Sequence, residues 1–121
     1  MTPKLFGYCM SLNDGDLIAG TLDVLVLKAL SWGPRHGYGI GRWISESTAA
    51  TLDVEEGALY PALHRMERRG WLESRWGKTE LGRRAKFYGL TRKGRRQLSE
   101  QTKRWHSYSQ AVSLLLDKSS I

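Results

Sequence analysis

The stretch from Glu55 to Trp76 constrains the fold most, because its hydrophobic period changes from that of a helix to that of a strand. In its first half, apolar residues recur every three or four positions, the spacing that lines one face of an α-helix. These residues are Leu59, Ala62, Leu63 and Met66. After Gly70, which suits the end of a helix, the side chains follow a period of two. The sequence therefore predicts a helix that leads directly into a strand.

The opposite face of this predicted helix carries groups that donate hydrogen bonds or bear positive charge. On a helical wheel the face consists of Gly57, Pro61, His64 and Arg68, flanked by Tyr60 and Arg65. Such a face suits a polyanion, because phosphate oxygens accept hydrogen bonds and attract cations.

Positive charge is concentrated in one part of the chain. Between Arg65 and Arg96 there are twelve lysines or arginines and three acids, a local charge of +9 within a total of +7, so the other residues sum to −2. Clustered charge beside aromatic groups points to nucleic acid before membrane, because clustered cations can neutralise several neighbouring phosphates.

No apolar run resembles a signal peptide or a membrane span, so we expect a cytoplasmic protein with no membrane partner.

Several classes of chemistry lack support. Cys9 is the only cysteine, which excludes an intramolecular disulfide and a cysteine-based metal site. His36, His64 and His106 fall on separate elements without metal-ligand spacing. The glycine-rich run at 37–41 follows no strand and is better explained as a helix start. A Ser–His–Asp triad stays open, although no nucleophile-elbow motif supports one. We expect no enzyme, no metal and no cofactor.

Two helices are expected before the central stretch. Asp14 or Asp16 can cap the first, which should run over residues 17–30. The second should begin after Gly37 and run to about Thr48.

A minimal strand is expected between the second and third helices, at Leu52 and Val54. Asp53 and Glu56 have the spacing of a capping box that would start the third helix.

Two strands are predicted after the third helix, over residues 71–76 and 84–91. Gly77 and Gly82 permit a hairpin turn in the segment that joins them.

A long final helix should follow Thr91, which is a good N-cap. Its apolar positions are Leu98, Trp105 and Val112 at intervals of seven, with Tyr108 and Leu115 between them. A helix of about 25 residues is about 38 Å long at 1.5 Å per residue, too long to be covered by so small a core. We therefore expect its apolar side to meet a second copy of the chain.

The expected fold class is mostly α with a small β-hairpin (α+β), because three helices followed by a two-stranded wing form a winged helix-turn-helix. The expected divisions are a weakly ordered N-terminal segment over 1–15, a winged-helix DNA-binding domain over 16–91 and a C-terminal dimerisation helix over 92–118. In this arrangement the third helix enters the major groove, while the hairpin lies along the phosphates or enters the minor groove.

The chain resembles the PadR family of bacterial transcriptional regulators in four motifs, which are GTLDVLVLKAL, GPRHGYGI, GALYPALHRMERRGWL and RRAKFYGLTRKGRRQL. The resemblance covers roughly residues 16–110. It implies a homodimeric winged-helix repressor, dimerised by its first and last helices. The chain departs from the family pattern at Glu55, Glu56 and Glu80, which add negative charge near the expected DNA.

The polar face, the basic wing and the resemblance together suggest a set of site residues. The expected DNA-binding residues are Tyr38, Tyr60, Pro61, His64, Arg65, Arg68, Lys78, Arg83, Arg84 and Lys86. The expected dimer interface, where some family members hold flat aromatic ligands, consists of Leu98, Trp105, Tyr108, Val112 and Leu115.

Simpler roles stay open for several of these residues. Tyr60 could only cover the rim of the core, His64 could only be solvated, and Trp105 could only be interface core. The cations Arg92, Lys93, Arg95 and Arg96 could only solvate the start of the last helix. Because positive charge there opposes the helix dipole, an external anionic partner is mildly favoured.

The expected function is that of a sequence-specific dimeric repressor on a pseudo-palindromic double-stranded operator, relieved by a small aromatic effector. Two alternatives remain. One is a nonspecific nucleic-acid-binding or architectural protein, which would bind any duplex with a similar salt dependence. The other is a protein-interaction module on a winged-helix scaffold, which would respond little to DNA.

Overall fold

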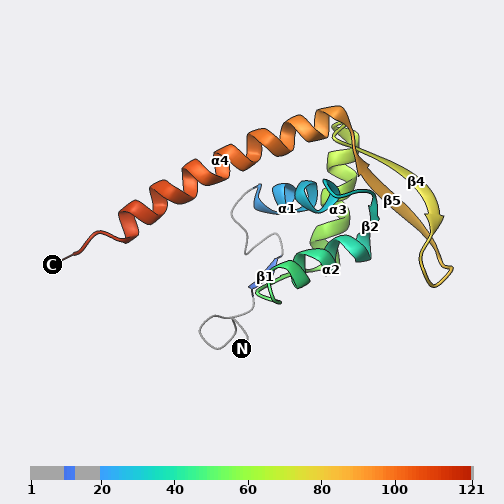
Figure 1. The fold of residues 1–121 in the computed structure, drawn as a ribbon, viewed down its shortest axis with the longest axis horizontal. Coiled ribbons are helices and arrows are strands. Elements are labelled where there is room, and N and C mark those ends of the chain that lie inside the picture. Colours follow the sequence, from blue (N-terminus) through green and yellow to red (C-terminus); the bar gives the residue numbers. More distant parts are fainter. Residues whose placement is uncertain (1–9, 13–19, 121) are drawn as a thin grey trace.

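The fold was obtained as a computed structural model that describes residues 10–12 and 20–120. Four helices and five strands occur in the described residues, and Figure 1 shows their arrangement. In chain order they are β1 (Met10–Leu12), α1 (Thr21–Leu30), β2 (Arg35–His36), α2 (Gly37–Ser47), β3 (Leu52–Val54), α3 (Glu56–Arg68), β4 (Leu72–Lys78), β5 (Arg84–Leu90) and α4 (Arg92–Leu116). The expected mostly α fold with a small hairpin is confirmed.

Two small sheets support the helices. The hairpin strands β4 and β5 pair antiparallel from Leu72 opposite Leu90 to Lys78 opposite Arg84, and β2 adds a third strand beside β5. The predicted minimal strand is confirmed as β3, which pairs in parallel with β1. The strand β1 was not expected. It pairs Met10 with Leu52, 42 positions further along the chain, and local sequence patterns do not indicate such a distant partner.

One hydrophobic core lies between α1, α2, α3 and the inner end of the hairpin. Its largest fully buried side chains are Val26, Leu27, Leu30, Ile40, Ile44, Leu63 and Met66. On the hairpin side the core is closed by Trp71, Leu72, Tyr88 and Leu90. Helix α4 packs on α1 and β5 near its beginning, then extends well beyond the rest of the fold (Figure 1).

The first helix begins later than expected. It starts at Thr21, after Gly20 in a left-handed conformation with a φ of 85° that a continuous helix does not contain. The predicted start at residue 17 is therefore wrong, and the proposed caps Asp14 and Asp16 lie outside the described residues.

The predicted capping box of the third helix is also wrong. Asp53 lies inside strand β3, paired with Ser11, and the N-cap of α3 is Glu55. The side chain of Glu55 does not cap this helix start with a hydrogen bond.

The other expected boundaries follow local rules. Gly70, at a φ of 80°, ends α3 in a Schellman motif, in which its N–H donates to the Glu67 carbonyl and the Trp71 N–H donates to the Met66 carbonyl, both at 3.0 Å. Thr91 caps α4, as its hydroxyl accepts the Gly94 N–H at 3.0 Å. Gly82 lies in the hairpin turn, but Gly77 belongs to β4, opposite Ala85.

Candidate nucleic-acid interface

The polar face of α3 is exposed along most of its length. Tyr60, Pro61, His64 and Arg68 are all on the surface, while the apolar residues of the same helix are buried. The two faces therefore separate as the helical period predicts.

Arg65 differs from the other residues of this face. Its guanidinium pairs with the carboxylate of Asp23 on α1, which is only 7% exposed. The pair connects α3 to α1 within the protein. Arg65 was expected to bind DNA, but its charge is already engaged by an internal partner.

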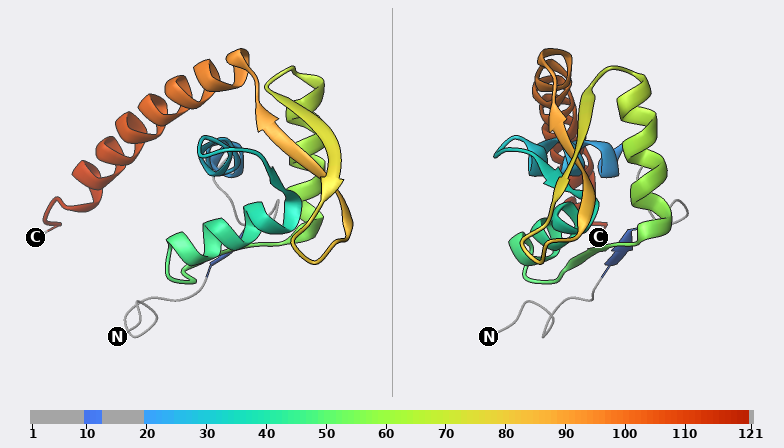
Figure 2. Two further views of the ribbon diagram at one scale, coloured as in Figure 1. Left: turned by 45° about the vertical axis from the view of Figure 1, so that its right-hand side comes forward. Right: turned by 90° about the vertical axis from the view of Figure 1, so that its right-hand side faces the viewer.

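A groove of about 970 Å³ lies between the beginning of α2, Tyr60 and the hairpin. We call it the wing groove. Its cations are Arg35, Arg42, Lys78, Arg83, Arg84 and Lys86, against two acids, Glu46 and Glu80. Figure 2 shows from two directions that the hairpin turn lies close to the beginning of α2. The wing groove brings the expected wing residues together with Tyr38 and Tyr60.

Tyr60 packs at the edge of the core and also lines the wing groove. Its ring lies against Gly37 at the beginning of α2, so closely that a methyl group at Gly37 would come within 2.7 Å of the ring. The residue nevertheless remains 38% exposed and lines the wing groove. Tyr60 thus covers the edge of the core and presents a surface to the groove.

His36 organises the beginning of α2, a role that sequence reasoning missed. Its Nδ1 accepts the Gly39 N–H at 3.1 Å, and its ring meets Phe87 edge-on at 5.3 Å between centroids. The ring of Tyr38 also stacks on the His36 ring, with 6.3 Å between centroids, and stays exposed. The signal was the position of His36 directly before a glycine-rich helix start, where a side-chain acceptor can cap the helix.

The basic residues of the hairpin are not equivalent. Arg84 lies over the ring of Trp76, with its Cζ 4.3 Å from the ring centroid. The ammonium of Lys86 lies 3.4 Å from a carboxylate oxygen of Glu67. Lys78 and Arg83 are exposed beside the turn.

Glu67 is stabilised in its charged form. The Ser74 hydroxyl donates a hydrogen bond to its carboxylate and, with Lys86 nearby, holds the pKa of Glu67 below its usual value. The same network joins the end of α3 to both hairpin strands. It therefore helps to hold α3 against the hairpin.

The residues expected at a dimer interface lie on α4, away from the wing groove. Leu98 packs against the core, and Val112 is half-buried. Trp105, Tyr108 and Leu115 are exposed, with the two rings 6.2 Å apart. An apolar stripe thus continues along the part of α4 that the core does not cover.

Among the residues that the structure describes, no helix is long and apolar enough to cross a membrane. Within the same ranges, no group of three His, Cys, Asp or Glu side chains could hold a metal ion.

Known proteins resemble the chain in sequence and in structure. An uncharacterized protein of Lysinibacillus sphaericus is 30% identical over 102 residues, which cover 84% of this chain and 94% of the relative. A transcriptional regulator from Clostridium thermocellum matches with a TM-score of 0.73 and 26% identity over 81% of this chain and 95% of that one. A PadR-like transcriptional regulator from Bacillus cereus strain ATCC 14579 matches with a TM-score of 0.70 and 30% identity over 83% of this chain and 95% of that one.

The family model described as the transcriptional regulator PadR-like family matches residues 26–100. That range begins within α1 and ends within α4, so it includes α3, the hairpin and the wing groove. The chain belongs to the PadR-like family of transcriptional regulators.

Proposed function

We propose that the protein is a homodimeric repressor that recognises a specific DNA sequence. The observation that carries the proposal is the wing groove, in which six cations and three tyrosines lie together, one of the tyrosines being Tyr60 on the exposed face of α3. A helix fits into the major groove, where base edges identify the sequence. Neighbouring cations then hold the phosphates and set the register.

The exposed side chains divide between these two tasks. His64 and Arg68 reach the bases, because they lie on the outer face of α3 and no ion pair of the described residues engages them. The phosphate contacts are Tyr38, Tyr60, Lys78, Arg83, Arg84 and Lys86. Pro61 packs close to the DNA backbone without donating a hydrogen bond. Arg65 connects α3 to α1 through its ion pair with Asp23.

The dimer forms through the apolar stripe of α4. Trp105, Tyr108 and Leu115 are exposed in the single chain, and a second copy would remove them from water. Two α3 helices would then enter successive major grooves about 34 Å apart, the spacing of half-sites one helical turn apart. A pseudo-palindromic operator follows from this two-fold symmetry.

A small aromatic effector would act at the same interface. The rings of Trp105 and Tyr108 lie 6.2 Å apart at a tilt of 41°, so they offer adjacent faces for stacking. A ligand that repacks the interface would change the distance between the two α3 helices. DNA release needs only that the ligand prefers one of the two arrangements.

The first experiment compares the promoter DNA directly upstream of the protein's own gene with a scrambled duplex of equal length, at two salt concentrations. A preference of about a thousandfold or more at moderate salt supports sequence-specific regulation. Equal binding to both duplexes, weakening together with salt, favours a nonspecific DNA-binding protein. Negligible binding to either favours a protein-interaction module.

Two substitutions refine the result. Replacing His64 or Arg68 with alanine should reduce discrimination between operator and scrambled DNA, because both are expected to meet base edges. An equal loss on both duplexes would reassign these residues to phosphate contacts.

For the effector, Trp105→Ala should abolish the response to flat aromatic compounds. An intact response would remove Trp105 from the effector site.

A further inference from the structure

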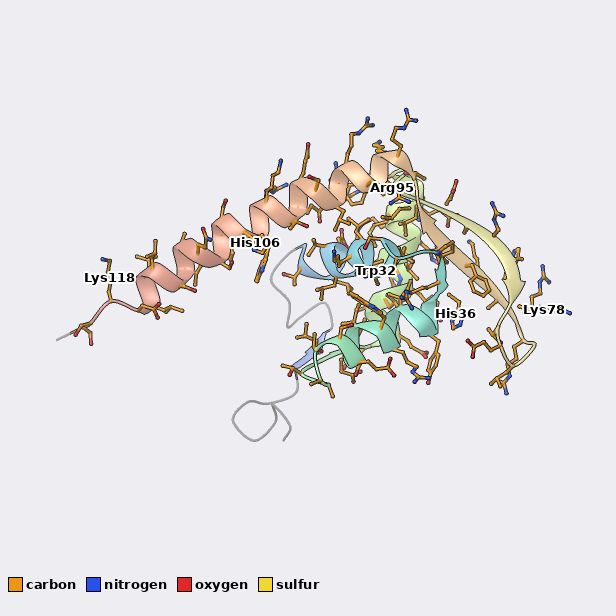
Figure 3. All side chains as sticks on the ribbon, in the orientation of Figure 1. Trp32, His36, Lys78, Arg95, His106 and Lys118 are labelled. Carbon is orange, nitrogen blue, oxygen red and sulfur yellow. The ribbon has the colours of Figure 1, made fainter. Side chains whose placement is uncertain are left out.

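Six cations gather where the end of α3 meets the beginning of α4. We call this group the junction cluster, and its members are Arg68, Arg69, Arg92, Lys93, Arg95 and Arg96. All six are exposed. Figure 3 labels Arg95 at this place, where the first turns of α4 lie by the C-terminal end of α3. The group is separate from the wing groove, which none of the six lines.

Hydrogen bonds from Thr91 and a close contact at Gly94 hold the two halves of the junction cluster together. The Thr91 hydroxyl donates to the Gly70 carbonyl at 2.6 Å, and the Thr91 N–H donates to the Trp71 carbonyl at 3.0 Å. Gly94 lies directly on the Trp71 carbonyl, where no side chain would fit. The cations of α3 and α4 therefore keep a defined relative position.

The junction cluster has no ion-pair partner among the residues that the structure describes. Glu67, the acid next to it in sequence, already interacts with Ser74 and Lys86. The first turn of α4 contains no acid, although a helix N-terminus favours negative charge. Like charges gathered against the helix dipole indicate an anionic partner outside the chain.

The dimensions of α3 identify where such a partner would lie. The helix has 13 residues and is therefore about 20 Å long. The major groove is about 12 Å wide, so a helix placed across it reaches both phosphate backbones. Tyr38 and the wing groove lie toward the beginning of α3, and the junction cluster lies at its end.

We propose that the junction cluster binds the phosphates on the far edge of the major groove, opposite those held at the beginning of α2. The recognition helix is then anchored at both ends. This inference rests on the DNA binding proposed above and adds contacts from Arg69, Arg92, Lys93, Arg95 and Arg96. Of the six, only Arg68 also belongs to the base-reading face.

The test compares two double variants that remove the same charge from one helix. Arg95→Gln with Arg96→Gln changes the junction cluster, and Lys103→Gln with Arg104→Gln changes two exposed cations two turns further along α4. Fluorescence anisotropy would measure the affinity of the full chain for a random-sequence duplex several helical turns long, over a series of salt concentrations. Circular dichroism would show that both variants keep their helices.

We expect the slope of log affinity against log salt to become shallower by about 2–4 for the junction variant, because the dimer loses up to four phosphate contacts and each lost contact removes about 0.9. The control variant should keep the wild-type slope. Equal slopes for all three proteins, or an equal change in both variants, would overturn the inference. If the double variant unfolds, Arg96→Gln alone provides the same comparison with about half the expected change.

The outcomes separate this inference from the function proposed for the whole protein. If the wild type prefers its operator but the junction variant behaves like the control, only the junction cluster loses its role. If the wild type binds no duplex, both proposals fail. If the junction variant loses affinity for vesicles of anionic lipid but not for DNA, the cluster is a membrane-binding surface and the inference is wrong.

Discussion

The guanidinium of Arg65 on α3 pairs with the carboxylate of Asp23 on α1, across 42 positions of sequence. Asp23 is nearly buried, whereas Arg65 is partly exposed. Helix α1 also packs against α4, so this pair lies on a direct connection between α4 and α3. The ion pair therefore helps to set the position of α3 relative to the rest of the molecule.

Arg65→Ala should destabilise the fold, because it leaves the carboxylate of Asp23 buried without its partner. We expect a loss of about 1–2 kcal/mol, less than for a fully buried pair because water reaches Arg65. Urea unfolding measures the change. Arg68→Ala, on the exposed side of the same helix, is the control and should change stability by less than about 0.5 kcal/mol. Equal stability losses in the two variants would contradict this account of Arg65.

Gly94→Ala should be far more damaging than other glycine substitutions in helices. A methyl group at Gly94 would overlap the Trp71 carbonyl, and backbone cannot move aside as a flexible side chain can. We expect a loss of at least about 2–3 kcal/mol, or a displaced α4.

Gly41→Ala is the matched control for that substitution. Gly41 lies inside α2, and a methyl group there would meet nothing within 4 Å. Alanine should therefore stabilise the protein by about 0.5–1 kcal/mol, through its higher helix propensity. Thermal unfolding of the two variants should move in opposite directions. A similar melting temperature for both would show that the junction of α4 with Trp71 is not as tight as described.

The stability contributed by Glu67 should depend on pH. Because the Ser74 hydroxyl and Lys86 lower its pKa, the contribution is fully present above the unfolded-state pKa of about 4.3 and is lost as the pH falls through the lower folded-state pKa. Glu67→Gln should therefore be less stable than the wild type at pH 7, and the difference should shrink in acid.

Denaturant unfolding at neutral and acidic pH measures this effect. Glu100→Gln serves as the control, since Glu100 is exposed on α4 and outside the network of Glu67. A difference between wild type and Glu67→Gln that stays constant down to acidic pH would show that the carboxylate charge is not what stabilises the network.

The sequence predicted correctly those features that depend on residues close to one another in the chain. The end of α3 at Gly70 and the beginning of α4 at Thr91 were predicted because caps are made by residues within one turn. The buried and exposed faces of α3 followed from the helical period alone.

The contacts that were missed join distant parts of the chain. The pairing of β1 with β3, the Arg65–Asp23 pair and the Glu67–Lys86 pair all depend on the folded arrangement. A helical wheel of α3 places Arg65 beside the polar face. Because the wheel shows only one helix, it does not reveal that Arg65 pairs with Asp23 on α1. For the same reason, counting charges treated Lys86 and Arg83 alike, although of these two only Lys86 forms an ion pair among the described residues.

Trp105→Ala combined with Tyr108→Ala should shift the protein from dimer to monomer. Both side chains are exposed in the single chain, on a part of α4 that the core does not cover, so their main contribution would come from contact with a second copy. Sedimentation should show a lower mass for the double variant. Operator affinity should fall steeply as well, because two linked α3 helices bind with a high effective concentration. Ser107→Ala, exposed on the same helix, is the control and should remain dimeric. A double variant that sediments like the wild type would place the dimer interface elsewhere.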